Sequence, residues 1–79
     1  MPQQKIKQDN IQIGKNIRKA RLAKNIGQTE LVCKLQLLNV SITREALVKI
    51  ERGIQHICAT QLKGIRDVLG TSYDELLKG

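Results

Sequence analysis

The stretch QTELVCKLQLLNVSITREALVKIERG, residues 28–53, decides the fold that this sequence predicts. Its apolar residues recur at helical spacing in two runs: Leu31, Val32, Leu35 and Leu38, then Leu47 and Ile50. Thr43 can cap the second run with its hydroxyl, and Gly53 can end it. The stretch therefore predicts a helix over 28–38, a connector, and a second helix over 44–52.

One further helix is predicted before this stretch. Asp9 or Asn10 can cap it, and residues 11–24 carry its helical period. The residues expected to face inward are Ile13, Ile17 and Ala20, with Leu22 as a further candidate. Asn25 and Gly27 are expected to break the chain after the helix, because Gly27 can adopt a positive φ.

Another helix is predicted after the stretch. Residues 54–58, IQHIC, have little helical tendency and are expected to form a loop pinned by Ile54 and Ile57. Residues 59–69 follow with a helical period, and Gly70 can cap their C-terminal end. The residues expected to face inward there are Leu62, Ile65 and Leu69.

The two ends of the chain differ in character. Ser72 and Glu75 form an S-x-x-E capping box, which predicts a short last helix through Leu77. Residues 1–10 begin MPQQKIKQ, are polar and basic, and lack a period, so they predict a flexible basic arm. The folded domain is therefore expected over 11–79, and no segment indicates a strand or an internal repeat.

Composition points to one small, basic, helical domain. The chain has 79 residues, 41% of them apolar, with one Tyr and no Phe or Trp, so its core must be aliphatic. Fourteen Lys and Arg against seven acidic residues give a net charge of +7, which attracts polyanions. Nucleic acid is the favoured partner, ahead of an acidic membrane surface or an acidic protein. The alternative is that the charge serves only solubility, as in many small basic domains.

The sequence carries no pattern typical of catalysis or of metal binding. Cys33 and Cys58 have no CxxC spacing and no histidine at ligand spacing, so we expect neither a metal site nor a cofactor. Each cysteine is interpreted as a small, half-buried hydrophobic residue in a reducing, cytoplasmic protein. His56 stands without a nucleophile or a paired carboxylate, so we do not expect an enzyme. No apolar run approaches the length that spans a membrane.

The outward face of the helix over 44–52 has the chemistry for reading DNA bases. If Leu47 and Ile50 face inward, Arg44, Glu45 and Lys49 lie on the outer face. Arginine and lysine can donate to guanine, and glutamate can accept from cytosine in the major groove. The alternative is an ordinary solvated charged face.

The order of these elements resembles the helix-turn-helix DNA-binding domain of the phage-repressor family, also called the Cro-like or xenobiotic-response-element family. IGKNIRKARLAKNIGQTEL resembles the opening of that domain, KIERG the end of its third helix, and LGTSYDELL its last helix. The resemblance covers residues 11–78 and implies an all-α, five-helix bundle of the lambda-repressor-like type. It also implies a sequence-specific transcriptional regulator that binds double-stranded DNA, with a repressor favoured.

The resemblance also implies roles for individual residues. Base edges are expected to meet Arg44, Glu45 and Lys49. Phosphates are expected to meet Gln28, Thr29, Thr43, Arg52, Gly53 and His56, with an exposed loop residue as the alternative for His56. Arg21 and Glu51 match a pair that forms a partly buried ion pair between the first and third helices. Lys15, Arg18, Lys19 and Lys24 are expected to be solvated.

The sequence departs from the family pattern between the second and third helices. After Lys34 and Leu35 it has about five extra residues, QLLNV. We expect them to add a turn to the second helix and to lengthen the connector, NVSI at 39–42. The angle at which the third helix is presented depends on this insertion.

A homodimer is expected, because one domain reads few bases and two-fold half-sites are the usual solution. Its interface is predicted on the last helix through Tyr73, Leu76 and Leu77, with core packing as the alternative for both leucines. A protein-interaction module or antitoxin-like component is the rival function. RNA binding is disfavoured by the scarcity of aromatic residues, and no small-molecule ligand is evident.

Overall fold

Five helices make up most of the part of the chain that the structure describes. The structure is a computed structural model and describes residues 5–6 and 12–79. Within them lie the helices α1 (Ile13–Ala23), α2 (Gln28–Leu37), α3 (Arg44–Glu51), α4 (Ala59–Leu69) and α5 (Tyr73–Leu76). The predicted all-α architecture is confirmed, and each helix begins and ends within a residue or two of its predicted bounds.

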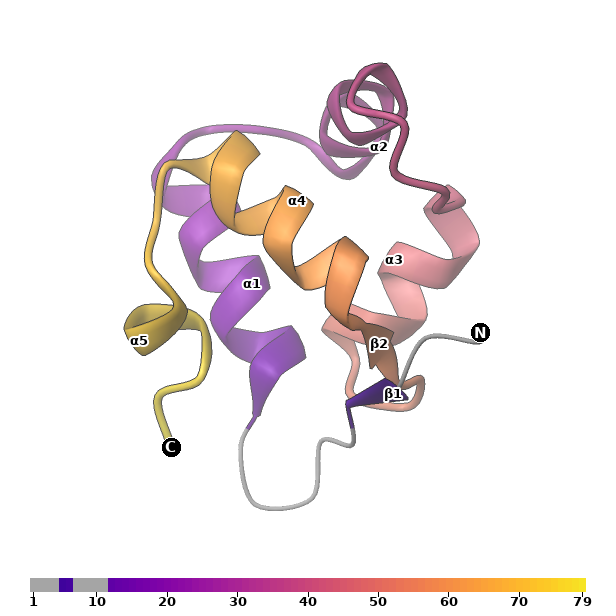
Figure 1. Cartoon of the computed structure of the whole chain (residues 1–79). Helices are drawn as coiled ribbons and strands as arrows, with labels where there is room; N and C mark the ends of the chain where they lie inside the picture. Colours follow the sequence, from indigo (N-terminus) through magenta and orange to yellow (C-terminus); the bar gives the residue numbers. More distant parts are fainter. Residues whose placement is uncertain (1–4, 7–11) are drawn as a thin grey trace.

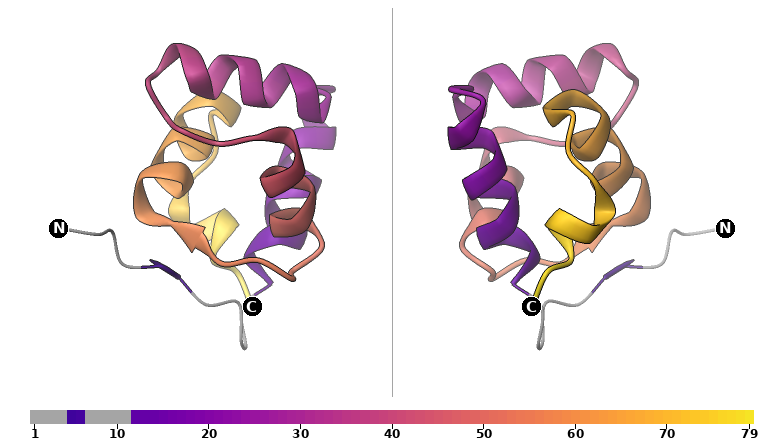
Figure 2. Two further views of the ribbon diagram at one scale, coloured as in Figure 1. Left: turned by 90° about the vertical axis from the view of Figure 1, so that its right-hand side faces the viewer. Right: turned by 90° about the vertical axis from the view of Figure 1, so that its left-hand side faces the viewer.

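α1 occupies the middle of the arrangement (Figure 1). It packs against α3 on one side and against α5 on the other, while α4 crosses it. α2 lies across one end of the other helices and contacts α3 and α4 (Figure 2). α3 and α5 are therefore held on opposite sides of the same central helix.

The core is aliphatic, as the composition predicted. Its buried members come from every helix and from the connecting segments: Ile13, Ile17, Leu31, Val32, Leu35, Val40, Ile42, Leu47, Ile50, Ile57, Leu62, Ile65, Leu69 and Leu76. Burying an aliphatic side chain of this size contributes about 1.5 to 3 kcal/mol to stability. Because the helices are short, this shared core rather than intrinsic helix propensity holds them together.

Three apolar positions that were predicted to pack inward are exposed instead: Leu22 (53% exposed), Leu38 (52%) and Ile54 (62%). On the last turn of α1 the inward position is taken by Arg21, which turns the next residue, Leu22, toward solvent. Leu38 and Ile54 lie in the turns that follow α2 and α3. The chain returns to the core only after these turns, so Val40 and Ile57 are buried instead.

Each of the helices α1 to α4 is followed by a residue in the left-handed backbone conformation. Asn25 (φ 57°) and Asn39 (φ 62°) follow α1 and α2, and Gly53 (φ 79°) and Gly70 (φ 63°) follow α3 and α4. The predictions for Gly53 and Gly70 are confirmed. The prediction for Gly27 was wrong, since its φ is −78°: Asn25, whose short polar side chain tolerates this conformation, makes the turn.

Hydroxyl caps start two helices where the sequence placed them. The Oγ1 of Thr43 accepts from the amide of Ala46 at 3.1 Å, and the Oγ of Ser72 accepts from the amide of Glu75 at 3.2 Å. At the start of α1 the N-cap is Gln12, whose side chain makes no capping bond. The caps predicted at Asp9 and Asn10 lie outside the described residues.

One short antiparallel pairing, which the sequence did not indicate, joins distant parts of the chain. Strand β1 (Lys5–Ile6) pairs with β2 (Ile57–Cys58), with Lys5 opposite Cys58 and Ile6 opposite Ile57. The rest of the predicted basic arm over 1–10 lies outside the described residues. β2 follows α3 closely, so β1 lies near the end of that helix (Figure 1).

Two glycines allow helices to approach closely. A Cβ on Gly14 of α1 would overlap the carbonyl oxygen of Ile50 in α3 and would come within 3.0 Å of the Cα of Glu51. A Cβ on Gly64 of α4 would lie 2.9 Å from the Cγ2 of Val40 and 3.0 Å from the Cδ2 of Leu35. The absence of a side chain at position 14 therefore sets the distance between α1 and α3.

The cysteines are both free thiols but differ in exposure. Cys58 is half-buried, as predicted, whereas Cys33 is exposed on α2 because Leu31, Val32 and Leu35 take the inward positions of that helix.

Among the described residues, none of the helices combines the length and the apolar character needed to cross a membrane.

Candidate nucleic-acid interface

α3 is fastened to the protein through one face. Leu47 and Ile50 are fully buried, and Glu51 is 7% exposed. Their spacing of three and four residues places them on one side of a helix. The helix is eight residues long and is capped by Thr43.

The other face of α3 presents the residues that were predicted to meet DNA bases. Arg44, Glu45 and Lys49 are all exposed, and Val48 beside them is half-buried. Glu45 and Lys49 are one helical turn apart, yet the ion pairs of the described residues do not include them. Two basic groups and one acidic group therefore stand on this face without a protein partner among those residues.

The predicted partners Arg21 and Glu51 form a buried, bidentate ion pair. The Nε of Arg21 donates to Oε2 of Glu51 at 2.8 Å, and its Nη2 donates to Oε1 at 2.9 Å. The third branch of the guanidinium, Nη1, donates to the carbonyl oxygen of Ile26 at 2.8 Å. The hydrogen bonds to Glu51 raise the pKa of Arg21 above its ordinary value, more than burial lowers it. The pair ties the end of α3 to α1 with fixed geometry.

Gln28, predicted to bind a phosphate, also contacts this pair. It is the first residue of α2, and its Nε2 donates to Oε1 of Glu51 at 3.2 Å. The amide is half-buried, so Glu51 accepts hydrogen bonds from both α1 and α2. The start of α2 and the end of α3 are thereby brought together.

The remaining predicted phosphate contacts are solvent-accessible. Thr29 lies on the first turn of α2 and Thr43 caps α3, while the others follow α3: Arg52, Gly53 and His56. Each of these residues is exposed. The left-handed turn at Gly53 is closed by the amide of Ile54, which donates to the carbonyl oxygen of Lys49 at 3.0 Å. That turn leads the chain away from the helix axis and leaves His56 at the surface.

The connector that leads into α3, which begins within the QLLNV insertion, is pinned by two buried side chains and two hydrogen bonds. Val40 and Ile42 are buried, 6% and 5% exposed, with Ser41 exposed between them. The Nε2 of Gln36 donates to the carbonyl oxygen of Ile42 at 3.3 Å, and that of Gln61 donates to the carbonyl oxygen of Ser41 at 3.1 Å. The connector is thus packed into the core and hydrogen-bonded to side chains of α2 and α4, and it leads directly into α3 (Figure 2).

Several residues that position α3 were missed by the sequence reasoning. Gly14 lies against the backbone of α3, and Val40 and Ile42 are buried in the connector that leads into it. The alternation of Val40, Ser41 and Ile42 is a two-residue period, which is typical of an extended segment with one buried face. That pattern could have revealed the packed connector, whereas nothing local to Gly14 could have shown that a carbonyl lies against it.

The interface predicted on α5 is corrected in part. Leu76 is fully buried and Leu77 packs against the core, so the core-packing alternative holds for both leucines. Tyr73 remains 36% exposed, and the guanidinium of Arg66 lies 4.4 Å from the centre of its ring. α5 is too short to offer a second apolar face, because its one turn uses Leu76 to dock against α1.

Within the described residues, no three His, Cys, Asp or Glu side chains cluster closely enough to hold a metal ion. No family model, no curated protein and no solved structure matches this chain.

Proposed function

We propose that this protein is a sequence-specific DNA-binding regulator, a repressor, of the lambda-repressor-like helix-turn-helix type. The proposal rests on one observation: α3 is buried and bonded on one side and presents Arg44, Glu45 and Lys49 on the other. A helix inserted in the major groove needs donors for guanine and an acceptor for cytosine, and these three side chains supply both.

Rigid support for α3 favours recognition over a merely charged surface. Side chains that read base edges must be held in a fixed frame, because discrimination depends on hydrogen-bond geometry. The Arg21–Glu51 ion pair, the close contact at Gly14 and the pinned connector all restrain this helix. In the proposed complex α2 and α3 form the helix-turn-helix unit, with an extended connector in place of the usual short turn.

Phosphate contacts would come from the ends of these helices. The first-turn amides of α2 favour an anion, and Thr29 is exposed beside them. Arg52 is exposed where α3 ends and would meet the backbone of the same groove. The net charge of +7 adds attraction at long range. The side-chain amide of Gln28 would keep one hydrogen bond to Glu51 and donate a second one to a phosphate.

A homodimer is part of the proposal. The domain measures 31 × 28 × 21 Å, so one copy covers few base pairs. Two copies reading half-sites about 34 Å apart would recognise enough sequence for a specific operator. Such a regulator would work in a reducing, cytoplasmic compartment, where the exposed Cys33 stays a thiol.

The function is tested by selecting DNA from a random pool and titrating the enriched site and an unrelated duplex against salt. We expect a steep salt dependence for both duplexes, and an affinity for the enriched site at least about 10³-fold higher. Equal affinity for the two duplexes at physiological salt contradicts the proposal.

Arg44→Ala is expected to weaken binding to the enriched site by about 1 to 3 kcal/mol and to relax preference at one base pair. The side chain is exposed and makes no hydrogen bond among the described residues, so folding should be unaffected. Binding is measured on the enriched duplex and on variants of each base pair. Unchanged preference at every base pair would show that α3 is not inserted in the proposed orientation.

Arg52→Ala is expected to weaken all DNA sequences alike and to lower the slope of log affinity against log salt by about 1. The reason is the loss of one phosphate contact without loss of base reading. Lys19→Ala is the matched control, because Lys19 is exposed on α1 beside α5, away from α3. An equal effect of both substitutions would indicate general charge attraction.

A protein-interaction module is the second candidate function. It is favoured by two exposed leucines at the end of α2, Leu37 (83% exposed) and Leu38 (52%), in a chain whose charge suits an acidic partner. The substitutions Leu37→Gln and Leu38→Gln would abolish partner binding in that case and leave DNA affinity unchanged.

A further inference from the structure

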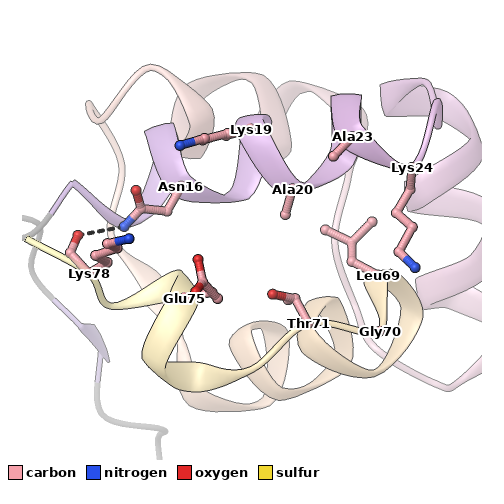
Figure 3. Close-up of a pocket in the computed structure, with 10 residues that line it drawn as sticks. All are labelled: Asn16, Lys19, Ala20, Ala23, Lys24, Leu69, Gly70, Thr71, Glu75 and Lys78. Atoms are coloured by element: carbon pink, nitrogen blue, oxygen red, sulfur yellow. Dashed lines mark hydrogen bonds between the residues drawn. The ribbon is translucent and has the colours of Figure 1, made fainter.

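We infer that the hollow between α1 and the α4–α5 segment is a binding site for a small organic anion with an apolar body, such as a short-chain monocarboxylate. The hollow has a volume of about 270 Å³. It lies on the side of α1 that faces α5 (Figure 3). The inference goes beyond the proposed function and does not depend on DNA binding.

The hollow exists because small side chains stand where α1 meets the segment after α4. Ala20 and Ala23 are three residues apart and share one face of α1. Across from them the chain leaves Leu69 through the left-handed Gly70. These residues give the hollow an apolar wall, visible in Figure 3, against which a hydrocarbon chain can pack.

The charges around this wall favour an anion. Lys19, Lys24 and Lys78 line the hollow, against the single carboxylate of Glu75. Among the described residues, none of these four side chains takes part in an ion pair. A carboxylate entering the hollow would therefore gain a cationic partner without breaking an existing pair.

We assign the carboxylate to Lys24. Its Nζ lies 3.6 Å from the point where a Cβ on Gly70 would stand, so the ammonium group sits over the turn that leaves α4. In Figure 3 it lies at the Leu69 end of the hollow, at the opposite end from Asn16 and Lys78. The hydroxyl of Thr71 also lines the hollow and can donate a second hydrogen bond to a bound anion.

The size of the hollow restricts the class of ligand. Sites for drug-sized molecules enclose about 300 to 1,000 Å³, so this hollow suits a smaller compound. A six-carbon monocarboxylate has an apolar chain for Ala20, Ala23 and Leu69 and a charge for Lys24. Hexanoate is therefore the probe of choice, with hexylamine as its counterpart of opposite charge.

The test is a titration of the full chain followed through the methyl resonances of Ala20 and Ala23. Hexanoate is expected to shift both methyls with saturation, and hexylamine and inorganic phosphate are expected not to. Lys24→Gln should weaken hexanoate binding about fivefold through loss of the charge. Lys15→Gln, which removes an exposed lysine of α1 that does not line the hollow, should leave it unchanged.

A second variant tests the cavity rather than the charge. Ala23→Leu would fill the apolar wall from an exposed position, so the fold should persist while saturable binding is lost. The inference is overturned if the methyls do not move, or if hexylamine shifts them as hexanoate does. Equal weakening by Lys24→Gln and Lys15→Gln also overturns it, because the anion would then be attracted by net charge alone.

Discussion

Gly14→Ala is expected to destabilise the protein by about 3 kcal/mol or more. The added Cβ would overlap the carbonyl oxygen of Ile50 and press on the backbone of Glu51. These are backbone atoms of α3, so no change of side-chain rotamer can relieve the overlap, and α1 and α3 must separate. The free energy of unfolding of a domain of this size is small, so we expect the substitution to unfold the protein partly or completely.

The measurement is urea unfolding followed by circular dichroism, with two other glycines as graded controls. Gly64→Ala would meet only the ends of the Val40 and Leu35 side chains, which can shift, so its cost should be smaller. Gly27→Ala has no atom within 4 Å of its new Cβ and should cost no more than about 1 kcal/mol. Any other order of the three losses would contradict the close approach of α1 and α3.

Arg21→Met is expected to lower the free energy of unfolding by about 3 to 5 kcal/mol. The substitution keeps much of the apolar stem but leaves the carboxylate of Glu51, 7% exposed, with only the amide of Gln28 as a side-chain partner. It also removes the donor to the carbonyl oxygen of Ile26. An uncompensated buried charge costs more than the net value of the pair.

A double-mutant cycle separates these contributions. Arg21→Met with Glu51→Leu should be less destabilised than Arg21→Met alone, because no buried charge then lacks a partner. Arg18→Met is the matched control, since Arg18 is exposed on the same helix, and it should change stability by less than about 0.5 kcal/mol. Additive effects of the two substitutions in the pair would mean that the ion pair contributes nothing by itself.

Most of the helices could be predicted because their bounds depend on local sequence patterns. The helices over 28–38, 44–52 and 59–69 follow from the spacing of aliphatic residues, and Thr43 and Gly70 mark ends that the structure confirms. Caps and period depend only on a residue and its near neighbours. The bounds of the helices can therefore be predicted without knowledge of how the helices pack.

The features that could not be predicted depend on contacts between distant residues. Leu22 looked like an inward residue until Arg21 took that position to reach Glu51, thirty residues away. The pairing of β1 with β2 involves two residues on each side, too few to produce a period. The hollow beside Ala20 depends on where α5 docks, which no sequence pattern encodes.

The division of α3 into a bonded face and a free face has a consequence for how such a protein can evolve. Positions 44, 45 and 49 are exposed, so substitutions there should change stability by no more than about 0.5 kcal/mol. If the proposed function holds, recognition can therefore change at these positions while Leu47, Ile50 and Glu51 keep the scaffold unchanged. A lineage, or a library randomised at the three outer positions, could explore new binding preferences without passing through unfolded intermediates.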